Sequence, residues 1–517
     1  MRPSAHGDIV HSRPVAIDYG GSTGVVVFYG ASDGMLHAIN GNQSNSIDAY
    51  APGSELWSFV APEHYGRLKR IYHNSPAITY PSVGDATAKP YFFDGPITAF
   101  KDSGTVWVFA TQRRGGRMIY AFDTSTPTSP SLKWRQGCPN LADDTNCTSS
   151  DFVSIGQTWS AAKILKASGY VSGSTPLPML ILGGGYDTCE DGQGSSDLNT
   201  CTAPKGNRIF VLDANNGSIL TTLSTDRSVV GDITVVPNTL TGLADYAYAA
   251  DTGGNVYHIT IGSAVPSNWT IMKIAALGCD TTACPGGVAN RKFMFAPEVV
   301  VAPSYNVILI GSGDREHPLL SHTTTTSVNN AFFMIKDKPS DAAWWSSETA
   351  NCQSQALACI TSLLAIDPDS TLLPTEAQLA SKKGWYMPFG TDGSGHDKEQ
   401  VVTSAVAVLG VVTFSTHTPT LPEKNSCYNL GEARVYNLGF MDGRPAGATR
   451  YVPVNGGGLP PSPVAGMVTV QDSVTGQDMT LPFLIGGSGV SSLEGSAPEP
   501  LATPARYKSR AYWYLQQ

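Results

Sequence analysis

Short apolar runs rich in Val, Ile, Phe and Tyr recur along the chain, and each is followed or divided by Asp, Asn and Gly. This pattern is found at 25–42, 116–123, 206–217, 248–259, 331–337 and 433–443. Runs of this length and composition predict β-strands. The Asp-Gly and Asn-Gly pairs supply the positive φ that two-residue hairpin turns require. Each repeat therefore predicts a β-hairpin.

The recurrence of these hairpins predicts how they pack. A lone four-stranded sheet cannot bury both of its faces, so hairpin units at intervals of roughly 40 to 90 residues indicate blades packed around an axis. The 517-residue sequence has 53 Gly, 35 Pro and only 15% charged residues, which suits many short strands joined by turns. We therefore expect an all-β fold in which residues 1–517 form a single β-propeller of seven blades, with eight as the alternative.

The uneven intervals between the hairpins require insertions. We place them in stretches that hold most of the cysteines and many turn residues: 135–150, 187–205, 278–290 and 345–375. A short helix is expected within 353–380, because Pro374-Thr-Glu-Ala-Gln-Leu-Ala resembles a helix start.

Eight of the nine cysteines fall into local pairs, 5 to 12 positions apart, in Gly/Asn/Asp/Thr-rich stretches. Such pairs are typical of surface loops stapled in an oxidising compartment, which indicates the periplasm or the cell exterior. A zinc site would need clustered ligands such as C-x-x-C, and that spacing is absent from the sequence. Cys427 is left over and is interpreted as a buried thiol. The predicted disulfides are Cys138–Cys147, Cys189–Cys201, Cys279–Cys284 and Cys352–Cys359.

Charge and hydropathy exclude two classes of partner. The net charge of −9 lacks the basic footprint that contact with nucleic-acid phosphates requires. The longest apolar run, 401–414, is interrupted by Thr and Ser and is too short to cross a bilayer. The first residues lack the apolar region of a secretory signal, so we expect a signal peptide to have been removed before this start.

The repeat pattern itself belongs to the quinoprotein-like repeat, which several secreted propeller families share. A narrower set of segments resembles the PilY family of type IV pilus proteins and runs in family order over nearly the whole chain. These segments are Gly7-Asp-Ile-Val-His-Ser-Arg-Pro14 and residues 29–38, 55–62, 91–95, 183–187, 231–236, 296–300, 311–315 and 384–386.

The resemblance implies both a setting and a role. It implies that the chain is the C-terminal part of a longer protein, whose N-terminal domain is von Willebrand A-like. It also implies a non-enzymatic function in pilus biogenesis, twitching motility, tip adhesion and surface sensing, with minor pilins and the pilus tip complex as partners. A host or abiotic surface is a further expected partner, but the resemblance does not identify the receptor on it. The expected location is extracellular, at the pilus tip or outer surface, reached through the periplasm.

One family feature is altered in this sequence. PilY propellers commonly carry a calcium loop of the form Asp-x-Asp/Asn-x-Asp-Gly-x-x-Asp after the strand that corresponds to 231–236. Here the ligand positions are Pro237, Thr239, Thr241 and Asp245, so one carboxylate remains. Calcium takes six to eight oxygen ligands, several of them charged. We therefore expect a degenerate site and no metal or other cofactor, with Asp245 ending a turn.

Other polar clusters are interpreted as structural. We expect a solvated acidic loop at Asp187, Glu190, Asp191 and Asp197, and a hairpin-tip charge cluster at 113–117. Three single histidines are expected to be structural. Five tryptophans are expected to fill gaps between blades rather than to stack on sugars. These residues are His37, His258, His317, Trp57, Trp107, Trp134, Trp159 and Trp385.

Two other functions are kept as alternatives to the pilus module. A quinone-cofactor-dependent periplasmic dehydrogenase shares the repeat, but such enzymes typically carry adjacent cysteines, and no two cysteines are adjacent here. A carbohydrate-binding propeller would differ only in the chemistry of its ligand. A serine hydrolase is not supported, because Val490 replaces the last glycine of Gly-x-Ser-x-Gly around Ser488 and no following helix is apparent. No catalytic residue is predicted.

Overall fold

The computed structural model gives a described position to most of the chain. The described residues are 7–73, 75, 89–191, 201, 204–282, 284, 289–320, 327–390, 395–420, 430–471, 478–487 and 495–496.

Within these ranges the strands form seven sheets of three or more strands, named here sheets 1 to 7 in chain order, and one separate two-stranded hairpin. Sheet 1 contains β1 (Val15–Asp18), β2 (Val25–Gly30), β3 (Leu36–Asn40) and β4 (Glu55–Phe59). Sheet 2 contains β5 (Ile97–Asp102), β6 (Thr105–Thr111), β7 (Arg117–Asp123) and β8 (Ser131–Cys138). Sheet 3 contains β9 (Lys163–Leu165), β12 (Met179–Gly183), β13 (Arg208–Asp213) and β14 (Ile219–Ser224). Sheet 4 contains β15 (Thr234–Pro237), β16 (Ala244–Ala250), β17 (Asn255–Thr260) and β18 (Thr270–Ala276).

The later sheets depart slightly from the four-stranded pattern. Sheet 5 contains β19 (Glu298–Val301), β20 (Asn306–Gly311), β21 (Ala331–Asp337), β22 (Leu363–Ala365) and β23 (Gly384–Pro388). Sheet 6 contains β24 (Gln400–Val401), β25 (Val406–Val408), β26 (Val411–Thr418), β27 (Glu432–Gly439) and β28 (Tyr451–Pro453). Sheet 7 contains β29 (Val464–Gln471), β30 (Asp478–Ile485) and β31 (Gly495–Ser496), and the separate hairpin contains β10 (Val171–Ser172) and β11 (Thr175–Pro176).

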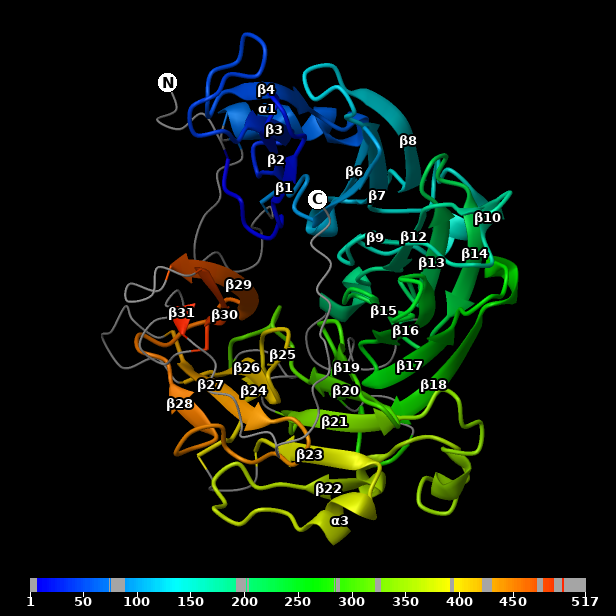
Figure 1. Ribbon diagram of the computed structural model, residues 1–517, viewed down its shortest axis with the longest axis vertical. Helices are drawn as coiled ribbons and strands as arrows, with labels where there is room; N and C mark the ends of the chain where they lie inside the picture. The colour runs from blue at the N-terminus through cyan, green and yellow to red at the C-terminus, as the bar shows by residue number, and fades with distance from the viewer. Residues whose placement is uncertain are drawn as a thin grey trace.

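The sheets follow one another around a common centre in chain order (Figure 1). Edge strands of consecutive sheets contact each other, as β1 does with β5, β5 with β9, β15 with β19 and β19 with β25. Strand pairing is antiparallel throughout sheets 1 to 4, and the pair β22–β23 in sheet 5 is parallel. The predicted all-β propeller is confirmed. The number of blades stays a prediction.

Each pair of neighbouring sheets from 1 to 6 encloses its own apolar core. Adjacent residues of one strand serve different cores: Leu180 packs with sheet 2, whereas Ile181 packs with sheet 4. In the same way Phe333 belongs to the core toward sheet 4, and Phe332 stacks on Phe414 of sheet 6 with ring centroids 3.8 Å apart. Because both faces of such a sheet are buried, its strands are continuous apolar runs rather than alternating ones.

Three tryptophans tie neighbouring sheets together by the same contact. In each case the tryptophan lies on the fourth strand in the order of its sheet, and its indole nitrogen donates a hydrogen bond to a backbone carbonyl of the next sheet. Trp57 of β4 donates to Pro127 at 2.9 Å, Trp134 of β8 to Ala214 at 3.1 Å, and Trp385 of β23 to Phe440 at 3.0 Å. These three confirm the prediction that tryptophans fill gaps between blades. Trp159 lies elsewhere, as described below.

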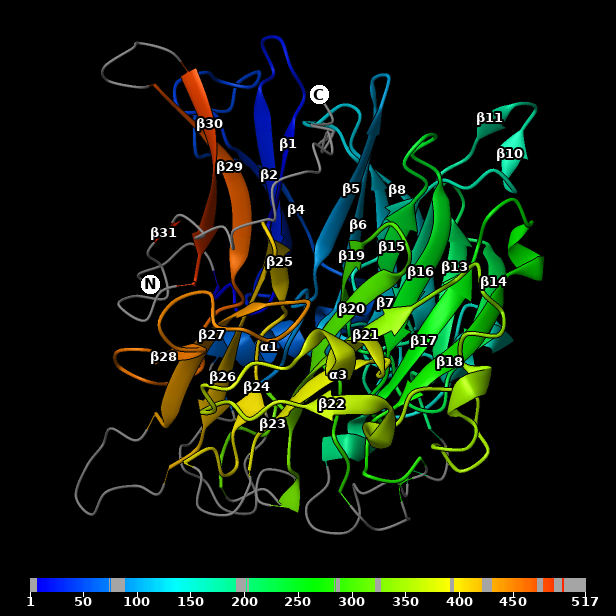
Figure 2. The same ribbon diagram turned by 60° about the horizontal axis from the view of Figure 1, so that its bottom comes forward.

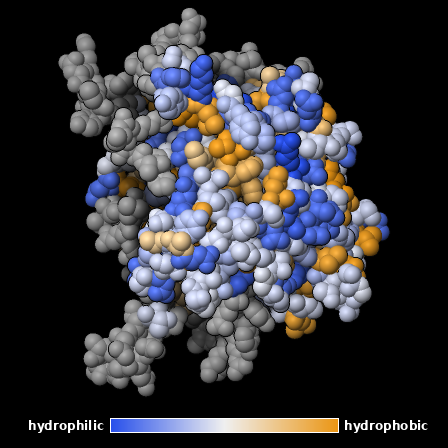
Figure 3. Space-filling model, turned by 90° about the horizontal axis from the view of Figure 1, so that it is seen from above, coloured by the Kyte–Doolittle hydropathy of each residue, from blue (hydrophilic) through white to orange (hydrophobic). Residues whose placement is uncertain are grey.

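Helix α1 (Tyr65–His73) follows β4, and α3 (Glu376–Ala380) lies in the insertion before β23. Thr375 caps α3, since its hydroxyl accepts a hydrogen bond from the Gln378 amide at 3.3 Å, so the helix expected within 353–380 is confirmed. No helix among the described residues combines the length and the apolar character that a bilayer crossing needs. Seen from the top of Figure 1, apolar side chains form separate patches among hydrophilic and neutral ones (Figure 3).

Candidate functional site

The four predicted cysteine pairs are joined as disulfides. The Cα–Cα distances are 4.0 Å for Cys138–Cys147, 6.0 Å for Cys189–Cys201, 5.5 Å for Cys279–Cys284 and 5.7 Å for Cys352–Cys359. Cys138 and Cys352 are completely buried. The disulfide-stapled loops expected from the sequence are therefore present. Cys427 lies outside the described residues.

Two of the stapled loops brace neighbouring sheets. The loop closed by Cys352–Cys359 belongs to sheet 5, yet Ala358 pairs with the outer strand of sheet 4. Its amide donates to Ile274 O at 2.8 Å and its carbonyl accepts from the Ala276 amide at 2.9 Å. Thr282, inside the Cys279–Cys284 loop, hydrogen-bonds the Gln353 side chain. These insertions hold sheets 4 and 5 together in addition to facing solvent.

The loop that we interpreted as a degenerate calcium site is closed by an asparagine. Asn238 Oδ1 accepts hydrogen bonds from the amides of Leu240 and Thr241 at 2.9 and 3.2 Å, and Asn238 Nδ2 donates to Asp245 Oδ2 at 2.8 Å. The one remaining carboxylate thus already has a hydrogen-bond donor where a cation would lie, and Thr239 and Thr241 offer only neutral oxygens. These residues do not fit calcium, which prefers several charged oxygen ligands.

Two of the three described carboxylates of the acidic loop, Asp187 and Glu190, are buried, so the expectation of a solvated loop is wrong for them. Glu190 is only 1% exposed, and Asp187 accepts hydrogen bonds from the amides of Cys189 and Lys205 at 2.9 and 2.8 Å. Asp187 therefore closes the base of the Cys189–Cys201 loop. Asp191 pairs with Arg114 at 3.0 Å. Asp197 lies outside the described residues.

The cluster at 113–117 lies in the turn of the β6–β7 hairpin, as predicted, but Arg113 and Arg114 are largely buried and paired there. The Arg113 and Arg114 guanidinium groups bind the two carboxylate oxygens of Glu316 at 2.7 and 3.1 Å, although Glu316 follows β20 of sheet 5 and the arginines follow β6 of sheet 2. Sheets 2 and 5 are not neighbours, so this contact bridges the ring. Arg117 is buried and donates to Ile155 O at 2.8 Å.

These groups form one cluster, called the charged hub below. Within it Lys292 lies 3.0 Å from Asp314 and 3.4 Å from Glu190. Its members come from the segments that follow or precede the strands of sheets 2, 3 and 5. They are Arg113, Arg114, Trp159, Tyr186, Glu190, Asp191, Lys292, Asp314 and Glu316.

Charge pairing favours the ionised forms of Glu316 and Asp314 despite their burial. Burial alone would raise the pKa of Glu316, but Arg113 and Arg114 hold it below its ordinary value. Burial likewise opposes the ionisation of Asp314, and Lys292 and His317 lower its pKa. Tyr186 donates to Asp191 at 2.9 Å, and burial with these carboxylates nearby raises the pKa of its hydroxyl. The hub therefore holds sheets together by mutually neutralising charges.

The three histidines singled out in the sequence make structural contacts. His37 is held between Glu55 at 2.6 Å and Asp33 at 3.1 Å, and these carboxylates raise its pKa against the opposing effect of burial. Burial lowers the pKa of His258, which lies 3.4 Å from Asp337. His317 Nδ1 lies 2.9 Å from Asp314.

One exposed element was missed by sequence reasoning. The hairpin β10–β11 projects from sheet 3 beyond the body of the propeller (Figure 2). Its strands hold only two residues each, and Val171 is 43% exposed. The Leu177 amide donates to Tyr170 O at 3.0 Å and closes the base. The sequence feature that could have indicated this hairpin is the stretch 168–175, which is rich in Gly, Ser and Thr.

The ring of sheets, the hairpin repeats and the stapled loops define a disulfide-bearing β-propeller. Residues 17–272 match the family model of the PilY1 beta-propeller domain. This part of the chain is therefore similar to the PilY1 propeller family, and the resemblance found in the sequence is confirmed.

Named relatives agree with this assignment. The chain is 24% identical over 446 residues to a type IV pilus biogenesis factor PilY1 homolog of Xylella fastidiosa, which covers 83% of this chain and 27% of the relative. It is 23% identical over 447 residues to the type IV pilus biogenesis factor PilY1 of Pseudomonas aeruginosa, with 76% and 33% covered. The chain thus spans about a quarter to a third of the length of these relatives.

The fold has a solved counterpart. The crystal structure of the Pseudomonas aeruginosa PilY1 C-terminal domain matches with a TM-score of 0.54 and 17% identity, over 92% of both chains. At this identity the likeness establishes the fold alone.

Proposed function

We propose that this propeller acts in type IV pilus biogenesis, as a non-enzymatic interaction module at the pilus tip or outer surface. The match of residues 17–272 to the PilY1 beta-propeller model carries the proposal. The two named relatives are described as type IV pilus biogenesis factors or their homologs. Four disulfides support a location in the periplasm or outside the cell.

The proposed partners are minor pilins of the pilus tip complex and a host or abiotic surface. The full-length protein is proposed to carry a von Willebrand A-like domain before this propeller, which agrees with the short share of the relatives that the chain spans. Adhesion and surface sensing would then depend on both parts of the protein. The propeller would contribute a rigid body from which exposed loops contact partners.

The hairpin β10–β11 is the element best suited to such contact. It lies apart from the sheet cores, whereas the stapled loop 352–359 is tied to sheet 4 and the base of the loop 189–201 lies against the hub. Contact residues on a projecting hairpin can change without disturbing the packing of the propeller. Attachment and folding should therefore be separable at this hairpin.

The test uses a piliated bacterium that lacks its own PilY1-type gene and receives the full-length protein carrying this propeller. In one variant Asn-Gly replaces residues 171–176, so that the Tyr170 and Leu177 base is kept. We expect pili to be assembled, while adhesion or twitching falls. The matched control is Ser103→Asn, which places Asn-Gly in the exposed β5–β6 turn, where residue 103 already has φ 48°.

The outcomes separate the parts of the proposal. Failure of the unaltered protein to restore pili would refute the pilus function. Equal adhesion by the hairpin variant and the control would refute only the role of β10–β11. Oxidation of alcohols by the purified protein with added quinone cofactor would favour the dehydrogenase instead.

A further inference from the structure

A cavity of about 1020 Å³ lies on the inner side of the ring, between the edges of sheets 1, 2 and 3 and the turn that joins β15 to β16. It is lined by residues of β1, β5 and β9, each of which is an edge strand of its sheet, and by Thr241, Gly242 and Leu243. The β1–β2 and β5–β6 turns and the hairpin β10–β11 lie at the same end of the propeller (Figure 2). The cavity therefore opens on the face from which this hairpin projects, and its size suits a ligand of several units.

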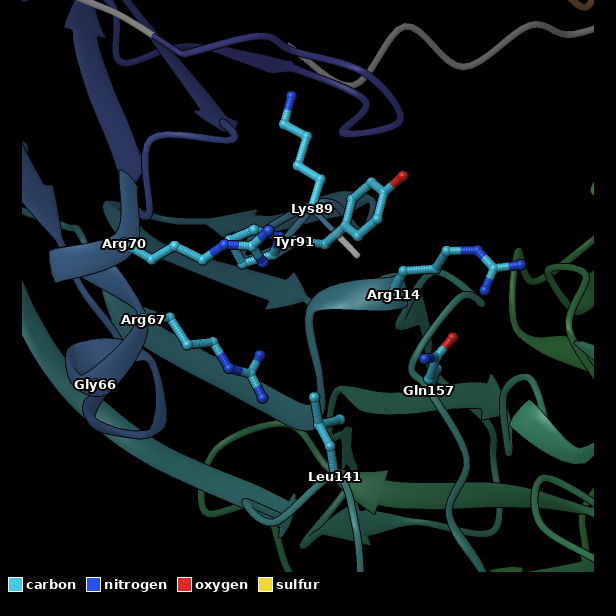
Figure 4. A pocket seen from close by; sticks show the side chains of 9 residues that line it. Gly66, Arg67, Arg70, Lys89, Tyr91, Arg114, Leu141 and Gln157 are labelled. Carbon is cyan, nitrogen blue, oxygen red and sulfur yellow. The ribbon is translucent and has the colours of Figure 1, made fainter. Parts of the chain in front are cut away.

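The charged residues of this lining neutralise one another. Lys166 Nζ binds Asp102 Oδ2 at 2.9 Å, and Lys101 Nζ donates to the backbone carbonyl of Asp18 at 2.6 Å. Because the lining holds two lysines and two aspartates, its formal net charge is zero. The cavity beside helix α1 differs, since all of its charged lining residues are cationic (Figure 4). A neutral polar ligand therefore suits the inner cavity better than an anion does.

Hydrogen-bond donors and acceptors lie side by side in this cavity. Asp102 also accepts from the Ser103 hydroxyl at 3.0 Å, and Thr241 adds a second hydroxyl to the lining. The side chains of Asp102 and Lys166 are 49% and 33% exposed, so a ligand can reach both. A carboxylate has more acceptor sites, and an ammonium group more donor sites, than one mutual contact uses. A sugar hydroxyl both donates and accepts, so it needs such neighbouring groups.

An aromatic surface adjoins these polar groups. Phe100 is half-buried and lines the cavity, as does the aliphatic side chain of Ile164. The Phe100 ring is supported by Trp107, with ring centroids 5.2 Å apart. Lys166 Nζ lies 5.5 Å from the centroid of the Phe100 ring and also binds Asp102. The lining thus offers an apolar surface for C–H groups next to polar groups that fix orientation.

Contacts between sheets hold the lining strands in place. The Ala244 amide of sheet 4 donates to Lys166 O of sheet 3 at 2.8 Å. The Thr98 hydroxyl of β5 donates to Ala162 O, just before β9, at 2.7 Å. A site whose walls are fixed before binding loses little conformational entropy when a ligand enters.

We propose that this cavity binds a neutral oligosaccharide, with sugar hydroxyl groups bonded to the pair Asp102–Lys166 and a sugar ring packed on Phe100. The inference does not depend on the pilus function. Glycans attached to a surface and free oligosaccharides both carry this chemistry.

The test applies the whole chain to an array of neutral oligosaccharides of hexoses and N-acetylhexosamines, printed beside sialylated glycans, sulfated glycans and a Thr-Val-Thr-Val-Thr peptide. We expect binding to neutral glycans that does not weaken as salt is added, because salt screens only contacts between charges. Calorimetry with the same glycan in free form then separates a site for soluble sugars from one that requires a surface glycan.

The variant Asp102→Ala/Lys166→Ala should lose about tenfold or more in affinity for the bound glycan. Its melting temperature should stay unchanged, because exposed ion pairs contribute little to stability. The matched control is Asp226→Ala/Lys273→Ala, which removes another partly exposed pair, 2.7 Å long and outside the cavity, at the same net charge. This control should bind as the unaltered chain does.

A second pair of variants tests the aromatic surface. Phe100→Leu should weaken glycan binding, whereas Tyr91→Leu makes the same change in the cavity beside α1 and should leave it unaltered (Figure 4). No binding to neutral glycans, or an equal loss in either control, would overturn the proposal. Binding confined to the charged glycans or to the peptide, which edge strands can pair with, would also overturn it.

Discussion

The guanidinium carbon of Arg113 lies 4.0 Å from the centroid of the Trp159 ring. Arg113 lies in the turn between β6 and β7 of sheet 2, whereas Trp159 precedes the first strand of sheet 3. The same guanidinium binds Glu316 near sheet 5, so one side chain joins three sheets. The sheets of a propeller contact mainly their neighbours, so a contact across the ring should add to the stability of the fold.

Glu316→Gln should destabilise the fold. Glu316 neutralises both Arg113 and Arg114, and the amide would leave two largely buried cations with one carboxylate fewer. Loss of one partner from a buried ion pair costs about 3–5 kcal/mol. Urea unfolding followed by circular dichroism measures this, with Glu376→Gln on α3 as the exposed control expected to change stability by about 0.5 kcal/mol or less. Equal effects of the two variants would contradict a stabilising hub.

Stability should fall in acid because of the same hub. Glu316 has a pKa below its ordinary value of 4.5, and the pKa of Asp314 is also lowered. Groups with lowered folded-state pKa values stabilise the protein fully above their unfolded pKa, and this stabilisation is lost as the pH falls through the folded value. The urea midpoint should therefore decrease below about pH 4.5, and less steeply in Glu316→Gln. Parallel pH profiles would contradict this assignment.

Local features of the sequence were predictable, whereas the hub was not. The Asp33-Gly34 turn and the pair Cys138–Cys147 depend on residues close in sequence, and Gly34 has the positive φ of 109° that the turn requires. Arg113 and Glu316 are 203 positions apart. Acidic and basic clusters rich in glycine have the pattern of solvated loops, and only the closure of the ring buries Glu190.

Removal of the Cys352–Cys359 disulfide should destabilise the propeller by about 2–3 kcal/mol. The disulfide holds the loop in which Ala358 pairs with sheet 4. The double variant Cys352→Ala/Cys359→Ala is compared with the unaltered chain in urea, after peptide mapping without reductant has verified the four local pairs. A link between different pairs, such as Cys147 to Cys189, would show the pairing to be wrong.

Calcium at millimolar concentration should leave the melting temperature unchanged. Asn238 donates to Asp245, and no further carboxylate remains at the ligand positions. The variant Pro237→Asp/Thr239→Asp/Thr241→Asp restores the carboxylates and should gain calcium-dependent stabilisation, because full carboxylate sets in extracellular modules bind at about 10⁻⁴ to 10⁻³ M. Differential scanning fluorimetry with calcium or chelator measures both. A calcium response of the unaltered chain that Asp245→Asn abolishes would contradict the prediction.

Gly217→Ala should destabilise the protein by weakening the junction between sheets 2 and 3. Gly217 has φ 74° in the turn after β13, and an added Cβ would lie 2.6 Å from Cδ2 of Trp134. Trp134 is held by its hydrogen bond to Ala214 O, so it cannot move away without losing that bond. Overpacking costs about 1–3 kcal/mol, and the positive φ adds about 1 kcal/mol.

Gly53→Ala is the matched control: its φ is 75° and nothing lies near its Cβ position, so it carries the backbone cost alone. In thermal unfolding Gly217→Ala should lose clearly more stability than Gly53→Ala, and Trp134→Phe, which frees space and removes the indole donor, should make the glycine substitution less costly. If the two alanine variants melted together, the contact between Trp134 and the Gly217 turn would not stabilise the junction between these sheets.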